Sequence, residues 1–184
     1  MNNKNLWIIR QQFAQCVFNH KIYEVATERF EKYSLYINIW NIIMVWLTLI
    51  FLVIQNFTKE EFYSNIASWI TVAEIIYLII QLQFNFWEKI RSYKTTALQY
   101  LWLRDNYKNF ISDIVNNNIE EKEFIFKKDN LQSKYQIINE LSLQTNRNDY
   151  METQRRLKTN WNNDEDFTWD DNEINKFLPQ ELKQ

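Results

Sequence analysis

Two long stretches of the chain are almost free of charged side chains. Residues 33–58 hold none, and residues 62–87 hold only Glu74. As an α-helix, which rises about 1.5 Å per residue, either stretch is longer than the roughly 30 Å hydrocarbon core of a bilayer. The first begins behind about 30 residues of mixed polarity, which is too late for a signal peptide. The pattern predicts an all-α fold built on two membrane spans, at about 36–57 and 64–87, joined as a helical hairpin.

Basic residues near the spans predict an orientation. Aromatic residues bracket both spans, as at a membrane interface: Tyr33, Tyr36, Trp40 and Phe57 around the first, and Tyr63, Trp69, Phe84, Phe86 and Trp87 around the second. Lysines and arginines gather in the sequence before the first span and after the second, whereas the loop between the spans carries only Lys59. Because cytoplasmic flanks carry the excess of Lys and Arg, we expect both termini in the cytoplasm and the loop outside.

Apolar positions with helical spacing continue on both sides of the hairpin. Before it, residues 5–32 form one amphipathic stripe, which either lies on the membrane or packs on a partner helix; its members are Leu6, Ile9, Phe13, Cys16, His20, Tyr23, Ala26, Phe30 and Tyr33. After it, no Gly or Pro interrupts residues 64–115, so the second span is expected to run on as one long helix. Residues 116–118, three asparagines, are the expected break.

Two further helices are predicted after that break. One covers about 119–144 and carries Leu131, Tyr135, Ile138 and Leu141. The other starts at Asp149, which pairs with Glu152 as a capping box and leads a face of Tyr150, Gln154, Leu157 and Trp161.

The composition excludes most catalytic motifs. The chain has no Gly, one Pro, one Cys and one His, so Gly-rich phosphate loops, nucleophile elbows, intrachain disulfides and His-rich metal sites are all excluded. His20 is expected to be a packed or interfacial histidine rather than a pH sensor. A formal charge of −2 gives no general nucleic-acid footprint. We therefore expect no enzyme activity, no catalytic residues, no cofactor, no metal and no direct binding to nucleic acid.

Polar residues inside the spans are the candidate functional site. They recur at three- and four-residue steps, so each span has one polar seam; the candidates are Asn38, Asn41, Thr48 and Gln55 in the first span, and Thr71, Glu74, Gln81 and Asn85 in the second. In an antiparallel hairpin Glu74 falls near the depth of Val45 and Thr48. Such residues face a bundle interior or a water path, or they hold helices together by hydrogen bonds, and the sequence leaves both interpretations open.

The last residues change character. We divide the chain into a membrane domain with cytoplasmic helices at 1–160 and an acidic tail at 161–184, in which seven acidic residues against two lysines give a net charge of −5. Asp170 or Asp171 can cap a short helix that Pro179 stops. The tail is either a solvated end or a docking peptide, and its candidate regulatory residues are Phe167, Trp169, Phe177 and Leu178.

Several local motifs, taken together, resemble the SLATT family of two-helix bacterial membrane effectors. They are the runs at residues 26–30 before the first span, 84–89 and 93–94 after the second, 103–114 and 128–141 in the following helices, and 167–179 near the end. The resemblance covers about residues 10–179, and the complete lack of Gly departs from it.

The resemblance implies an effector of the bacterial inner membrane. Such a protein self-associates in the lipid bilayer and forms a pore or disrupts the membrane, so that the infected cell stops growing in anti-phage defence. It implies a cytoplasmic trigger, such as a sensor or a nucleotide-signalling or reverse-transcriptase partner. Composition alone implies only a two-span helical membrane protein, and the richness in Asn, Ile and Lys also suits a structural accessory subunit of a membrane complex, for example a protist respiratory assembly.

Overall fold

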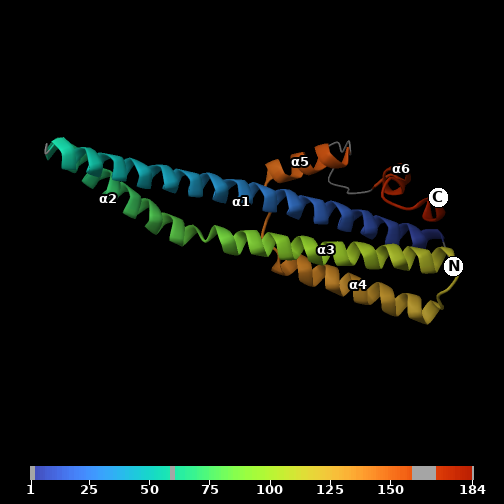
Figure 1. Cartoon of the computed structure of the whole chain (residues 1–184). Helices are drawn as coiled ribbons and strands as arrows, with labels where there is room; N and C mark the ends of the chain where they lie inside the picture. Colours follow the sequence, from blue (N-terminus) through green and yellow to red (C-terminus); the bar gives the residue numbers. More distant parts are fainter. Residues whose placement is uncertain (1–2, 59–60, 159–168, 184) are drawn as a thin grey trace. The chain divides into compact units, whose positions relative to one another are not determined.

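The fold is all-α, as predicted. The structure, a computed structural model, describes residues 3–58, 61–158 and 169–183, and none of these residues lies in a β-strand. The elements are the α-helices α1 (Asn3–Thr58), α2 (Glu61–Phe84), α3 (Phe86–Val115), α4 (Glu121–Leu141), α5 (Arg147–Leu157) and α6 (Asp171–Asn175), and the 3₁₀ helix η1 (Gln180–Leu182) (Figure 1). Contacts divide the chain into two units, which we call the hairpin (residues 28–90) and the bundle (residues 1–27 and 91–184).

The hairpin consists of two antiparallel helices with almost no buried interior. Two helical stretches are long and apolar enough to cross a membrane, one within Asn5–Thr58 and one within Glu61–Val115. Among the described residues of 28–89, only Ser34 and Ala67 are buried. Large apolar side chains point outward on all sides, for example Trp46 at 62% and Trp69 at 75% exposure. A soluble protein would bury such helices in its core, so the two spans predicted from the sequence are confirmed as candidate membrane helices.

The second span does not run on unbroken, contrary to the prediction. α2 ends at Phe84 and α3 begins at Phe86, with Asn85 between them in a left-handed conformation (φ 37°). Asn is among the few residues that enter this region at low cost. Its carbonyl accepts the amides of Glu88 and Lys89, and its side chain donates to the Glu88 carboxylate. The prediction failed because it counted only Gly and Pro as helix breakers.

The bundle is organised around the first part of α1. Most of the predicted stripe is buried there, from Leu6 to Ala26, while His20 and Phe30 are half-buried and Tyr33 is exposed. α3 covers one side, where Tyr23 stacks on Tyr100 with ring centroids 5.6 Å apart. α4 contributes Tyr135, whose hydroxyl accepts from Asn19. The stripe therefore packs on partner helices, which was one of the two alternatives predicted for it.

The later helices follow the prediction with one correction. The chain breaks at Asn117, which has positive φ, and α4 buries Leu131 and Ile138. α5 is capped by Asn146, not by Asp149: the Asn146 side chain accepts from the Asp149 amide, and the Asp149 carboxylate accepts from the Asn146 amide. Asp149 is thus the third helical residue of the capping box. The helix begins three residues earlier than predicted, because Asn caps a helix as well as Asp does. Trp161, predicted on this helix, lies outside the described residues.

His20 is a packed residue. Its Nδ1 lies 2.9 Å from the Ala97 carbonyl of α3, and its Nε2 lies 3.4 Å from the Glu24 carboxylate one turn along α1.

Cys16 is expected to be inert in the folded protein. It is fully buried in α1, and burial raises the pKa of its thiol, so little thiolate forms at neutral pH. A maleimide at pH 7 should leave Cys16 unmodified in native detergent and modify it fully in SDS, as measured by intact mass. Complete labelling of the native protein within minutes would contradict the packing of α1 in the bundle.

Candidate functional site

One hydrogen bond sets the register of the two hairpin helices. The Asn41 amide nitrogen donates to the Gln81 side-chain oxygen at 2.9 Å, which places α1 residue 41 opposite α2 residue 81. Both residues are half-buried. Interhelical bonds between such side chains are a normal way to hold helices together in lipid.

The other polar residues of the seam follow at heptad steps from this pair. Moving seven residues along each antiparallel helix brings Thr48 to the depth of Glu74, and the next step brings Gln55 to the depth of Ala67. Thr48, Glu74 and Gln55 are all half-buried, and Ala67 is 2% exposed. A seven-residue repeat keeps one row of each helix facing its partner. The row of Asn41, Thr48 and Gln55 therefore faces the row of Ala67, Glu74 and Gln81.

The remaining seam candidates lie outside this contact. Asn38, Thr71 and Asn85 are all exposed. They occupy the neighbouring heptad rows, because Asn38 precedes Asn41 by three residues and Thr71 precedes Glu74 by three. The Thr71 hydroxyl donates to the Ala67 carbonyl of its own helix, as the Thr48 hydroxyl does to Met44. The structure thus brings five of the eight predicted residues together and leaves three on the hairpin surface.

A crevice opens at one end of the seam. It measures about 500 Å³ and is lined by Ser34, Asn41, Leu78, Gln81, Asn85, Phe86 and Trp87, all of them in the hairpin. The Asn41 side-chain oxygen is buried there without a hydrogen-bond partner in the structure. Buried acceptors of this kind are normally satisfied by ordered water. The crevice is large enough to hold several water molecules, and Ser34, Asn41, Gln81 and Asn85 are the polar residues in its lining.

The C-terminal segment, which we define as Trp169–Lys183, docks on α1. The Gln11 side chain holds the Trp169 backbone from both sides: its nitrogen donates to the Trp169 carbonyl at 2.7 Å, and its oxygen accepts from the Trp169 amide at 2.8 Å. Of the four predicted regulatory residues, Trp169 and Leu178 are buried, Phe177 is half-buried, and Phe167 lies outside the described residues.

Arg10 is a functional candidate that the sequence interpretation missed. Its side chain is 1% exposed and lies under the C-terminal segment. It donates to the Leu182 carbonyl at 3.0 Å and to the Asn175 side-chain oxygen at 2.8 Å, and it lies 3.4 Å from the Asp171 carboxylate. The sequence offered one indication of its burial, which is that Arg10 directly follows Ile9 of the apolar stripe. A lone arginine at such a position is more often a solvated residue, because buried arginines need partners.

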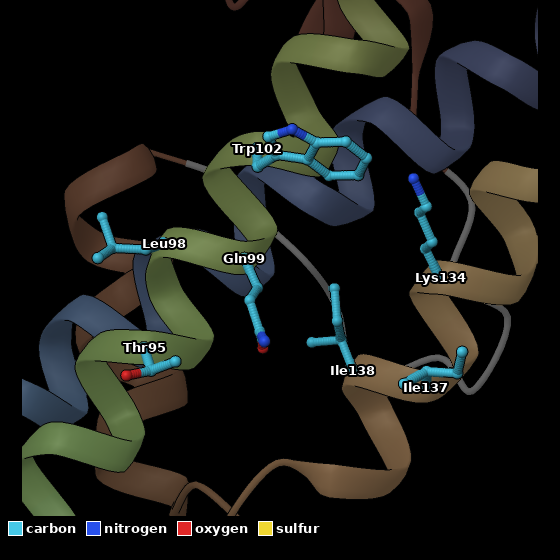
Figure 2. A pocket seen from close by; sticks show the side chains of 7 residues that line it. All are labelled: Thr95, Leu98, Gln99, Trp102, Lys134, Ile137 and Ile138. Carbon is cyan, nitrogen blue, oxygen red and sulfur yellow. The ribbon is translucent and has the colours of Figure 1, made fainter.

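A second concave surface lies in the bundle, on α3 and α4. It measures about 400 Å³ and is lined by Thr95, Leu98, Gln99, Trp102, Lys134, Ile137 and Ile138 (Figure 2). The Lys134 ammonium lies 4.3 Å from the centre of the Trp102 ring, a cation–π contact. The described ranges contain no cluster of three or more His, Cys, Asp or Glu residues that could hold a metal ion.

The fold and the seam define a helical membrane protein whose hairpin of two candidate spans is joined to a helical bundle. The chain belongs to the SMODS and SLOG-associating 2TM effector domain family 4, whose family model matches residues 6–173. This confirms the resemblance inferred from the sequence motifs, and it makes the protein a two-transmembrane effector of the kind associated with bacterial conflict and anti-phage systems. Comparisons with curated proteins and with solved structures give no match.

The Asn41–Gln81 bond should appear as a coupling energy between the two residues. Asn41→Leu and Gln81→Leu each remove the bond, so a double-mutant cycle should give a coupling of about 0.6 kcal/mol in favour of the hairpin, typical of such bonds in membranes. The measurement is the free energy of unfolding in bicelles by steric trapping. The matched control is a second cycle in which Asn38, an exposed residue one turn from Asn41, is tested in its place. The Asn38→Leu and Gln81→Leu cycle should give a coupling near zero. Equal couplings in the two cycles would contradict the register.

Proposed function

We propose that the protein is an effector that assembles into homo-oligomers in the bacterial inner membrane and opens a water-filled path when a cytoplasmic partner or signal triggers it during anti-phage defence. The observation that carries the proposal is the polar seam with its open crevice, in a hairpin whose large exposed side chains are apolar. Two helices cannot enclose a channel by themselves, so the path needs several copies.

The distribution of polar side chains supports self-assembly. Asn38 and Thr71 lie on exposed positions beside the seam, where lipid would surround them in a single copy. Polar residues at membrane depth normally face a bundle interior or water. In an assembly, these positions and the seam form one continuous polar sector, and the exposed apolar side chains remain against lipid or a neighbouring copy.

The charge pattern supports the orientation. With the basic residues that flank the spans on the cytoplasmic side, both termini and the whole bundle lie in the cytoplasm, where a sensor, a nucleotide-signalling enzyme or a reverse-transcriptase partner is available. The C-terminal segment is then in reach of such a partner, which supports a regulatory role for it. The proposed activity needs no catalytic residue or cofactor, and its partners are other copies of the chain, the bilayer and the trigger.

The orientation predicts a labelling pattern in intact cells. In a Cys16→Ala background, Thr58→Cys in the loop should react with a membrane-impermeant maleimide added outside. Asn117→Cys, which is exposed between α3 and α4, should react only after the cells are permeabilised. The reverse pattern, read by gel shift, would overturn both the orientation and the cytoplasmic trigger.

Glu74 is expected to be necessary for depolarisation. Glu74→Leu should insert at least as well as the wild type, because it removes a mid-membrane carboxyl group that is unfavourable by roughly 2.5–3.5 kcal/mol if charged. It should nevertheless lose depolarising activity, since the polar path is interrupted at the depth of Thr48. Glu74→Gln keeps the size and hydrogen bonding, and it should conduct with weaker preference for cations.

The measurements are membrane potential in induced cells and reversal potential in planar bilayers. Val72→Leu, an exposed apolar position in the same span, is the matched control and should behave as wild type. Depolarisation by Glu74→Leu at the wild-type level would remove this residue from the mechanism.

A further inference from the structure

The contacts of the C-terminal segment on α1 have the form of peptide recognition. Gln11 binds the backbone of Trp169 through a donor and an acceptor at once, which fixes the position of the peptide without reading its side chain. The Trp169 indole, 2% exposed, is the anchor: its ring lies 6.2 Å from that of Phe18 and 6.3 Å from that of Phe177, centre to centre. Buried indoles surrounded by aromatic rings are typical anchors of peptide interfaces.

Arg10 adds selectivity at the other end of the same site. Its guanidinium binds one backbone carbonyl, that of Leu182, and two side chains, those of Asn175 and Asp171. The segment contains only short helices, since α6 has five residues and η1 has three. Its order therefore depends on the surface of α1.

The segment is attached as a tethered ligand would be. Eleven residues, 158–168, lie between the end of α5 and Trp169, and a chain of that length spans at most about 40 Å. A short tether gives a bound segment an effective concentration of about millimolar. A competing peptide therefore has to bind more tightly than the segment, or arrive joined to another contact.

We propose that the surface of α1 between Arg10 and Phe18 is a peptide-binding site, that the C-terminal segment is its resident and exchangeable ligand, and that a triggering partner binds there with a segment of the same chemistry. The required partner peptide carries a tryptophan and, two residues later, a carboxylate. The proposal goes beyond membrane activity. Its triggering partner rests on the cytoplasmic trigger of the proposed function, whereas the binding site itself stands or falls independently of pore formation.

The burial of Arg10 determines what the partner must supply. If the resident segment leaves and nothing replaces it, the guanidinium loses every side-chain and carbonyl partner that the segment provides. The uncovered guanidinium is then hydrated, and any new occupant of the site has to replace that hydration with hydrogen bonds and a negative charge of its own. An acidic peptide with free carbonyl acceptors restores those bonds, whereas a basic or purely apolar peptide does not.

The test is an exchange experiment on the full-length protein in detergent. A protease recognition sequence replaces residues 160–166, so that cleavage removes the tether but leaves the segment in place. A fluorescent synthetic peptide of residues 167–183 is then added in excess, and its binding is followed by anisotropy. We expect it to replace the resident fragment, and unlabelled peptide to compete with it.

Substitutions in the synthetic peptide test the contacts without affecting the folding of the protein that binds it. Trp169→Ala should weaken binding by about tenfold or more, since it removes the anchor. Asp171→Asn should weaken it by about threefold, because it removes a charge-assisted contact with Arg10. Asp170→Asn is the matched control: it alters the neighbouring carboxylate, which is exposed and makes no capping bond, and it should bind within about twofold of the native peptide.

A receptor variant closes the test. With Arg10→Met, the native peptide should bind more weakly, and the difference between it and the Asp171→Asn peptide should disappear. Two results would overturn the proposal: a resident fragment that never exchanges over days in excess peptide, which would make it a permanent part of the bundle, or equal binding by the native and Trp169→Ala peptides, which would indicate non-specific apolar adhesion. Both readouts are taken without a membrane, so failure of the channel proposal would leave them unchanged.

Discussion

The arrangement of side chains in the hairpin suits a surrounding of hydrocarbon rather than water. Only Ser34 and Ala67 are buried among its described residues up to 89, so the hydrophobic effect has almost no interior to act on. In hydrocarbon the same exposed apolar side chains carry no penalty, and the unfavourable groups become the polar ones. Asn41, Glu74 and Gln81 lie where that constraint allows them, between the two helices. The seam, the register and the proposed path all follow from this reversal of solvent.

The same constraint explains which parts of the fold were predictable. A run of charge-free residues long enough to cross a bilayer is a strong signal, and both spans appear as helices. The seam was predicted as two rows of alternating three- and four-residue steps, and the structure shows one row of each helix in contact. Asn41 and Asn38 both belong to the predicted stripe, and only the crossing of the helices decides that Asn41 faces α2. Sequence spacing alone does not fix the rotation of each helix about its own axis.

Local chemistry was harder to predict where two residues compete for one role. Asn85 interrupts the second apolar helix although neither Gly nor Pro is present, because an asparagine can adopt positive φ and its side chain bonds Glu88 in the first turn of the next helix. Asn146 rather than Asp149 caps α5, since either residue is a good cap and Asp149 serves as the third helical residue of the same capping box. Arg10 was missed for a different reason: its partners lie more than 160 residues away in the chain, and no local pattern contains that information.

Arg10 and the seam are on the same continuous helix. α1 runs without interruption from Asn3 to Thr58, so the residues that hold the C-terminal segment and the residues that face α2 share one hydrogen-bonded backbone. The return path is different, because Asn85 separates α2 from α3. A change at residues 10–18 therefore acts on a helix that also carries Asn41, Thr48 and Gln55. The proposed exchange of one acidic peptide for another at Arg10 would thus take place on the same helix that carries the seam.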